Sequence, residues 1–387
     1  MSPRRTAAVV ALAVLTAGTA LVSFAPRLLP VVGHLRATGR DAASVTAVAS
    51  TQPRWVAPVT GWPSALAADR AGAVVLAGGG EVRALEPDGA TRWRVDVPGA
   101  GLHPPALGRT TVLVGARARI VALDRTTGAT RWEAPAPEAA APHPVALAGG
   151  LALVGTETGA LMALDAHTGE TRWSVLYPGS IRSAPVVSLP HDTRSEGVVA
   201  ATWHGGAEPR LRALDLVTGA VRWDAPLLAF ASAPVTSGGL VVVGEGDGHY
   251  AARVVARRVR DGVEAWSAPV PASFESGIIP GAAGGEVAVV DHFGTVTVLD
   301  ATTGAVRTRT ELEEPVLHTT VLLTGEDLVL TTHHGTIAVI DRESGRVRSR
   351  GSLGGYPAAI ARSGSDLLVA VRLRDPGRVE SIPLPLH

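Results

Sequence analysis

Short runs of apolar residues, bounded by glycine-rich turns, recur along the chain from about residue 51 to its end. Segments such as residues 119–124, 151–155 and 160–165 have the length of a β-strand and are too short for a buried helix. Gly, Asp and Thr gather between the runs, as turns require. No helical period follows residue 50, so this part of the chain is predicted to be all-β.

An eleven-residue phrase recurs within this pattern. It reads ALDRTTGATRW at 122–132, ALDAHTGETRW at 163–173 and ALDLVTGAVRW at 213–223, with degraded copies at 84–93, 256–266, 298–308 and 339–349. From Gly89 to Gly345, the successive turn glycines are 39 to 50 residues apart. A period of about 40–45 residues is typical of a β-propeller or another stacked array.

Each copy of the phrase is predicted to form a β-hairpin that docks onto its neighbour. Asp124 can accept hydrogen bonds from the turn amides, and Gly128 can supply a positive φ at little steric cost. Trp132 carries a large apolar surface that we expect to lie between adjacent sheets. The residues expected to dock in this way are Trp93, Trp132, Trp173, Trp223 and Trp266, with Gly128, Gly169 and Gly219 at the turns.

The two ends of the repeat region predict how the ring closes. Two further strands precede each hairpin, which makes four short strands per unit, as in a propeller blade. Residues 53–57 resemble a lone outgoing strand, and residues 356–384 supply three strands before the chain ends. Together they make one blade and remove the open edges. The prediction is an eight-bladed propeller of four-stranded blades, with seven blades as the alternative.

The first 25 residues predict a route out of the cytoplasm. Arg4 and Arg5 precede residues 7–25, an uncharged apolar stretch of about the length that spans a bilayer. The segment 1–25 is therefore expected to be a transmembrane anchor or a cleaved signal peptide, and 26–50 a linker to the propeller at 51–387. We expect a single-pass membrane protein with the propeller outside the cytoplasm, or a secreted protein if the signal is cleaved.

Composition excludes several kinds of chemistry. The formal net charge is zero, so the chain lacks the basic excess that nucleic-acid binding requires. It contains no cysteine and no lysine, which excludes disulfides, thiolate nucleophiles, Schiff bases and a P-loop lysine. No GxSxG nucleophile motif occurs.

The phrase Ala122-x-Asp124-x-x-Thr127-Gly128-x-x-x-Trp132 resembles the tryptophan-docking motif of pyrroloquinoline-quinone-type propellers. The resemblance covers about residues 51–387 and implies the fold more strongly than an activity. The family includes quinone-dependent alcohol dehydrogenases and cofactor-free scaffolds such as the outer-membrane assembly lipoprotein BamB, and this chain resembles its membrane-anchored actinobacterial members. The dehydrogenases share a vicinal cysteine pair and calcium ligands that usually include asparagine, and this chain has neither residue type.

Candidate chemistry gathers at the expected mouth of the central channel. The starts of the innermost strands and the turns between second and third strands lie on one face of a propeller. Aligning the blades places these candidate ligand residues there: Trp62, His103, His143, His318, Tyr356, His292 and His333. Imidazoles converging on a channel can bind a metal, an anionic or aromatic ligand, or a partner. Solvated loop histidines without a ligand are the simpler interpretation.

The sequence therefore predicts a monomeric binding scaffold without catalytic residues, resident metal or cofactor. Its partners are expected to be proteins or envelope components, with the membrane contacted only through the N-terminal helix. One alternative is an atypical metal- or quinone-dependent oxidoreductase that binds pyrroloquinoline quinone with calcium. The other is a module for carbohydrates or small ligands.

Overall fold

The computed structural model describes residues 52–100, 103–136, 145–188, 197–205, 208–247, 252–270, 279–291, 293–316, 321–372 and 377–384. All of them belong to one compact unit, Val45–His387. The other unit, Met1–Ser44, lies outside the described residues, and so does the expected N-terminal helix. Within the described ranges, no helix is long and apolar enough to cross a membrane.

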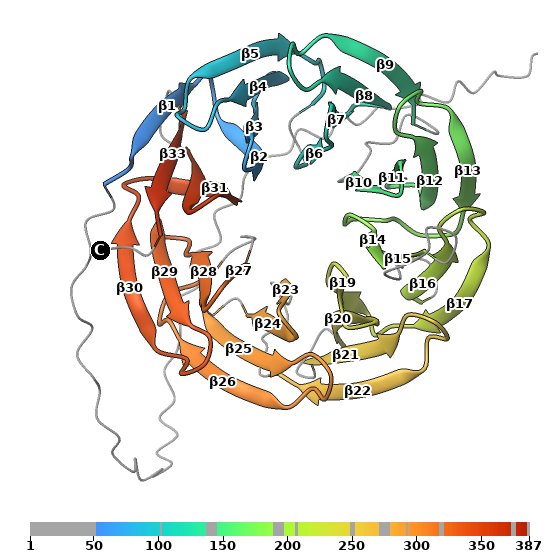
Figure 1. The fold of residues 1–387 in the computed structure, drawn as a ribbon. Helices are drawn as coiled ribbons and strands as arrows, with labels where there is room; N and C mark the ends of the chain where they lie inside the picture. Colours follow the sequence, from blue (N-terminus) through green and yellow to red (C-terminus); the bar gives the residue numbers. More distant parts are fainter. Residues whose placement is uncertain are drawn as a thin grey trace, which may run out of the picture. The chain divides into compact units, whose positions relative to one another are not determined.

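The described residues form eight antiparallel sheets, which we number as blades along the chain (Figure 1). Blade 1 contains β2 (Pro63–Asp69), β3 (Gly72–Ala77), β4 (Glu81–Leu85) and β5 (Thr91–Asp96). Blade 2 contains β6 (Ala106–Leu107), β7 (Thr111–Ala116), β8 (Arg119–Asp124) and β9 (Thr130–Pro135). Blade 3 contains β10 (Ala146–Ala148), β11 (Leu151–Gly155), β12 (Ala160–Asp165) and β13 (Thr171–Leu176). Blade 4 contains β14 (Val186–Ser188), β15 (Val198–Trp203), β16 (Arg210–Asp215) and β17 (Val221–Pro226).

The second half of the ring repeats this plan. Blade 5 contains β18 (Phe230–Ala231), β19 (Val235–Ser237), β20 (Leu240–Gly246), β21 (Ala252–Arg258) and β22 (Glu264–Pro269). Blade 6 contains β23 (Ile279–Ala283), β24 (Glu286–Val290), β25 (Thr295–Asp300) and β26 (Val306–Glu311). Blade 7 contains β27 (Leu322–Thr324), β28 (Asp327–Thr331), β29 (Thr336–Asp341) and β30 (Val347–Ser352). Blade 8 contains β31 (Tyr356–Ser363), β32 (Asp366–Arg372), β33 (Gly377–Pro383) and β1 (Trp55–Val59). In blade 5, β18 and β19 pair one after the other along β20, so the innermost strand of this blade is divided into two segments.

The eight blades surround a central axis, with the innermost strand of each blade facing inward (Figure 1). The innermost strands of neighbouring blades contact one another from blade 1 to blade 7, β28 of blade 7 contacts β31 of blade 8, and β2 contacts β31 where the ring closes. The predicted all-β, eight-bladed propeller of four-stranded blades is therefore confirmed for the described residues, and the seven-bladed alternative is wrong.

Ring closure combines the two ends of the propeller in blade 8. Strand β1 pairs antiparallel with β33, and Trp55 lies opposite Ser381. One strand from the start of the repeat region thus completes three strands from its end, as the sequence predicts. This pairing leaves no open sheet edge between the first and last blades.

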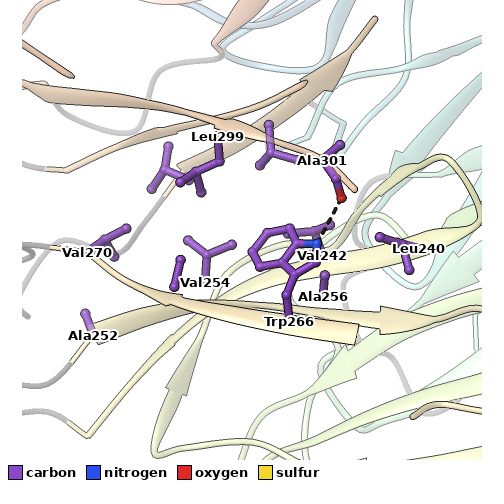
Figure 2. Packing of buried hydrophobic residues seen from close by; sticks show 12 residues of the cluster. Leu240, Val242, Ala252, Val254, Ala256, Trp266, Val270, Leu299 and Ala301 are labelled. Atoms are coloured by element: carbon purple, nitrogen blue, oxygen red, sulfur yellow. Dashed lines mark hydrogen bonds between the residues drawn. The ribbon is translucent and has the colours of Figure 1, made fainter. Parts of the chain in front are cut away.

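The core consists of apolar layers between neighbouring blades. One cluster combines Val242, Val254 and Trp266 of blade 5 with Val287 and Leu299 of blade 6 (Figure 2). Apolar side chains of both sheets interdigitate there, as in packed sheets generally. Most of these residues are almost completely buried, so each blade is stabilised chiefly by its neighbours.

Candidate functional site

The repeated turn has the geometry that its residues predict. The Asp124 carboxylate accepts hydrogen bonds from the backbone N–H groups of Thr126 and Thr127, at 2.8 and 2.9 Å. Gly128 has a φ of +76°, in the left-handed region that favours glycine. The same Asp oxygen also accepts a bond from the Thr127 hydroxyl. Hydrogen bonds within the turn thus hold the end of this hairpin without any contribution from another blade.

At six of the eight blade interfaces, a tryptophan of one blade lies on the turn glycine of the next blade. Trp266 packs against Gly304, where an added Cβ would lie 2.4 Å from the ring. The Trp266 indole Nε1 donates a 3.0 Å hydrogen bond to the carbonyl of Ala301 (Figure 2). Equivalent indole bonds to the following turn occur at six blade interfaces, made by Trp55, Trp93, Trp132, Trp173, Trp223 and Trp266. The five predicted docking tryptophans and the glycines at positions 128, 169 and 219 therefore have structural contacts.

Two interfaces around blade 7 lack this tryptophan. Thr308 occupies the position between blades 6 and 7 and packs on Gly345, while the Thr310 hydroxyl donates a 2.6 Å bond to the Gly345 carbonyl. Ser349 occupies the corresponding position facing blade 8. Apolar clusters still fill both interfaces. Blade 7 is consequently packed without an indole on either side.

The turn aspartates also form ion pairs with arginines of the same hairpin. Seven residues after the turn aspartate, an arginine returns to its carboxylate: Arg172 Nη2 lies 2.7 Å from Asp165 Oδ2, and Arg307 contacts Asp300. The Arg172 guanidinium and the turn amides lower the pKa of Asp165 to about 2. Arg307 and the turn around Thr303 do the same for Asp300, whose pKa is also about 2. On the side of the propeller that carries the Asp-x-x-Thr-Gly turns, the charged side chains are therefore largely paired within the repeated hairpins.

A polar cavity of about 430 Å³ lies on this side, between blades 6 and 7. Its arginines are held by carboxylates: Arg342 and Arg307 lie 2.7 and 2.8 Å from Glu286, and Arg348 lies 2.9 Å from Asp327. Because the lining charges already form ion pairs, they stabilise the interface and leave no unpaired cation for an anionic ligand.

One buried cluster was not predicted from the sequence. Arg212 lies against two aromatic rings that meet edge to face, with its guanidinium carbon 4.3 Å from the centre of Tyr177 and 5.1 Å from that of Trp203. Trp203 is fully buried and donates a 2.9 Å hydrogen bond from Nε1 to the Gly159 carbonyl of blade 3. This cation–π cluster joins blades 3 and 4 in addition to Trp173. Trp203 lies outside the repeated phrase, so only its position in strand β15 could have drawn attention to it.

We call the opposite side of the propeller the channel-mouth face. It consists of the loops that lead into the innermost strands and of the turns between the second and third strands of the blades. Backbone hydrogen bonds connect these loops with these turns. The Gly78 amide donates to the Trp62 carbonyl at 2.9 Å, and the His333 amide donates to that of Pro315 at 2.9 Å. The side that carries the Asp-x-x-Thr-Gly turns is called the docking-turn face.

The structure brings together two of the predicted site residues. The Tyr356 hydroxyl lies 2.7 Å from His333 Nε2, and the two rings meet edge to face with centroids 4.5 Å apart. Trp62 lies at the start of β2, on the blade adjacent to Tyr356, and His103 precedes β6 in a half-buried position. His143, His292 and His318 lie outside the described residues. Within the described ranges, no three His, Asp or Glu side chains are grouped closely enough to hold a metal ion.

Large exposed aromatic side chains gather on the channel-mouth face. Trp62 is 60% exposed and Tyr356 43% exposed, while Phe230 and Phe293 are 56% and 61% exposed. All four stand in loops or strand starts on this face. Neither phenylalanine was predicted from the sequence to belong to the site. Phe293 stands next to the expected ligand His292 in a second-to-third-strand turn, which was a usable signal.

The sequence model of one protein family, described as "Outer membrane protein assembly factor BamB", matches residues 78–230, 184–269 and 251–379. These overlapping matches extend over most of the propeller. Among curated proteins, a 127-residue alignment with the serine/threonine-protein kinase AfsK of Streptomyces griseus is 40% identical. It covers 28% of this chain and only 15% of the kinase, so it includes a small part of that protein.

Solved propellers share the fold at low sequence identity. BamB from Moraxella catarrhalis aligns with a TM-score of 0.65 and 16% identity, covering 86% of this chain and 99% of BamB. The quinohemoprotein alcohol dehydrogenase from Comamonas testosteroni aligns with a TM-score of 0.63 and 13% identity, covering 86% of this chain and 76% of the enzyme. BamB, an outer membrane protein assembly factor, and an alcohol dehydrogenase therefore share this architecture, and fold similarity alone does not separate their functions.

Proposed function

The chain belongs to the family of the outer membrane protein assembly factor BamB, and from that membership and the two unlike faces of its propeller we propose that it is a non-catalytic binding scaffold. It is held at the membrane by residues 1–25, carries its propeller outside the cytoplasm, and presents the channel-mouth face to protein partners of the envelope. It acts as a monomer and needs no cofactor.

The distribution of exposed aromatic residues carries this proposal. Trp62, Phe230, Phe293 and Tyr356 all lie on the channel-mouth face. Aromatic side chains in such patches dominate binding energy at protein interfaces. The docking-turn face instead carries carboxylates and arginines that pair with one another. One face is thus suited to bind, and the other is occupied by the contacts that hold the blades together.

The residues at the channel mouth do not supply the donor set of a quinone dehydrogenase. The chain has no cysteine for a vicinal pair over the quinone and no asparagine for the calcium. Two buried acidic residues near the mouth already have other contacts. Glu245 is bonded to Arg253 and to the Leu228 amide, and Asp291 accepts a bond from the Thr295 amide. These observations favour a scaffold over the oxidoreductase.

Site-specific photo-crosslinking in the native cell tests the binding role. A photoreactive amino acid replaces Trp62 on the channel-mouth face or Val217, which is also exposed, on the docking-turn face. We expect discrete protein adducts from position 62 and none from position 217. Adducts that are equally abundant from both positions, or absent from position 62, would contradict the proposal.

The cellular location has a separate test. Alkaline phosphatase, which is active only outside the reducing cytoplasm, is fused after His387. The proposed topology predicts an active fusion whose activity is lost when residues 7–25 are deleted. An inactive fusion on the full chain would place the propeller in the cytoplasm and contradict this part of the proposal.

A further inference from the structure

Four aromatic residues of the channel-mouth face lie on the successive blades 6, 7, 8 and 1. We define the aromatic arc as Phe293, His333, Tyr356 and Trp62, one residue from each of these blades. Three of the four side chains are largely exposed and His333 is half-buried. Neighbouring members are related by a ring contact, by the loop 312–316 or by Arg372.

The loop 312–316 joins the blade 6 end of the arc to blade 7. The Leu312 amide donates to the Gly294 carbonyl at 3.1 Å, next to Phe293. At the other end of the loop, the Glu314 carboxylate accepts a 2.7 Å bond from the Thr332 hydroxyl, next to His333. This loop therefore contacts both the turn that carries Phe293 and the turn that carries His333.

Two further contacts connect the arc residues of blades 7, 8 and 1. His333 and Tyr356 are in ring contact. Arg372 lies opposite Tyr356 in the sheet of blade 8, and its Nε donates a 3.0 Å bond to the Pro63 carbonyl, next to Trp62. The arc therefore includes one direct ring contact, between blades 7 and 8, and is connected to blades 6 and 1 through the loop 312–316 and through Arg372.

Charge is unevenly distributed along the aromatic arc. Glu313 is exposed and Glu314 half-buried at the blade 6 to blade 7 end, and in the described part of the chain no arginine forms an ion pair with either carboxylate. Glu313 also has a φ of +60°, which is uncommon for a residue other than glycine. Arg372 carries positive charge at the other end. A partner segment would therefore place a cation near the glutamates and apolar side chains along the rings.

We propose that the aromatic arc binds an extended segment of a partner protein in which an arginine or lysine stands next to apolar or aromatic residues. An extended segment can follow the curved rim and contact each blade in turn, with rings providing the binding energy and the glutamates selecting the basic residue. This inference rests on the proposed scaffold function and specifies its partner.

A phage-displayed library of random dodecapeptides, selected on the immobilised full-length chain, tests the assignment. We expect enriched peptides to combine a basic residue with neighbouring apolar or aromatic residues. Their Kd is expected to rise at least about tenfold when Trp62→Ala and Tyr356→Ala are combined. Glu313→Gln with Glu314→Gln should weaken binding about threefold to tenfold, and added salt should have less effect on this variant than on the original protein.

Matched controls lie on the docking-turn face. Val217→Ala and Glu343→Gln remove an exposed apolar side chain and an exposed carboxylate there, and neither should change the Kd. All variants are compared only after their thermal unfolding midpoints agree with that of the original protein. Double variants that fail this check are replaced by the single substitutions Trp62→Phe and Glu313→Gln, each expected to weaken binding by about twofold to fivefold.

Peptides that are insensitive to the arc substitutions, or that depend on Val217 or Glu343, would overturn the arc and leave the scaffold function standing. Failure to enrich any peptide would also overturn it, and the crosslinking experiment then decides the scaffold function independently. Retention of the full-length chain on insoluble β-glucan, abolished by Trp62→Ala, would assign the arc to carbohydrate instead of a peptide.

Discussion

At the scale of single residues, tryptophan has two distinct roles in this protein. The six docking indoles donate hydrogen bonds to backbone carbonyls of the next blade, and most are almost fully buried. Trp62 is instead 60% exposed and lies outside the repeated phrase. The same residue type thus builds the ring at six positions and is available for binding at another.

The two roles predict unlike costs of truncation. Trp266→Ala removes a side chain that is only 9% exposed and leaves a cavity between blades 5 and 6. We expect it to lower the free energy of unfolding by about 3–5 kcal/mol. Trp62→Ala should change it by less than about 0.5 kcal/mol. Urea unfolding measures both, and a loss below about 1 kcal/mol for Trp266→Ala would show that docking is not what stabilises the interface.

Alanine substitutions at two turn glycines distinguish the cost of backbone strain from the cost of a steric clash with the indole. Gly304 and Gly239 have similar φ values of +72° and +79°, but an added Cβ contacts Trp266 only at Gly304, and nothing lies within 4 Å at Gly239. Gly239→Ala should therefore cost about 1 kcal/mol for backbone strain, and Gly304→Ala roughly 2 kcal/mol more. Equal losses in urea unfolding would mean that the indole does not press on the turn.

Residue roles within the phrase were predictable because they depend on neighbours in sequence. Asp124 caps its own turn and Gly128 adopts its own φ, so the phrase contains the information for both. The cluster of Tyr177, Trp203 and Arg212 was not predictable in this way. Tyr177 follows strand β13 of blade 3, whereas Trp203 and Arg212 belong to strands β15 and β16 of blade 4, and only the folded ring brings them into contact.

At the scale of elements, the hairpin end is fixed by charge as well as by hydrogen bonding. The ionised carboxylates of Asp165 and Asp300 accept bonds from an arginine and from turn amides. Both carboxylates stay on the surface, so each pair contributes modestly to stability. Their repetition around the ring makes the sum measurable.

This arrangement predicts the acid dependence of stability. The pKa of Asp165 and of Asp300 is about 2 in the folded protein, against about 4 in an unfolded chain. Their contribution is therefore fully present above about pH 4 and is lost as the pH falls from about 4 to about 2. Unfolding midpoints measured across this range should fall, and Asp300→Asn should reduce the fall. An Asp300→Asn variant with an unchanged pH profile would contradict the role given to this carboxylate.

The sequence predicted on which face of the propeller the candidate residues lie, but it predicted only partly which of them contact one another. The start of each innermost strand follows from the hairpin order, which placed Trp62, Tyr356 and His333 on one side. Lateral contact depends on which blades are adjacent and how their loops run. Blades 7 and 8 bring Tyr356 and His333 together, whereas the loop before blade 7 inserts Glu314 between the turns of blades 6 and 7. The sequence pattern contains no comparable signal for such loop paths.

At the scale of the whole molecule, the ring depends on the pairing of β1 with β33. The count of eight blades was predictable because one strand at the start and three at the end complete a single sheet. The division of the innermost strand of blade 5 into β18 and β19 was not predictable. This strand differs from the innermost strands of the other blades in the path of its loop and not in its apolar pattern.

A disulfide across the closure tests its contribution. Ala57 and Val379 are buried register partners in β1 and β33, at a spacing that a disulfide accommodates, and the natural chain has no cysteine to interfere. Ala57→Cys combined with Val379→Cys should raise the unfolding midpoint by about 5 °C under oxidising conditions, and a reductant should reverse the gain. Failure of the bond to form, with Ala57→Cys alone folded normally, would contradict the register of the closing blade.

The most direct test of the whole account is a titration of the purified full-length chain with pyrroloquinoline quinone, with and without calcium, followed by the quinone absorbance. A propeller that works by binding partners through the channel-mouth face predicts no saturable change under either condition. Saturable, calcium-dependent binding that is weakened by Tyr356→Phe or His333→Ala would contradict the account and identify the channel mouth as a redox site.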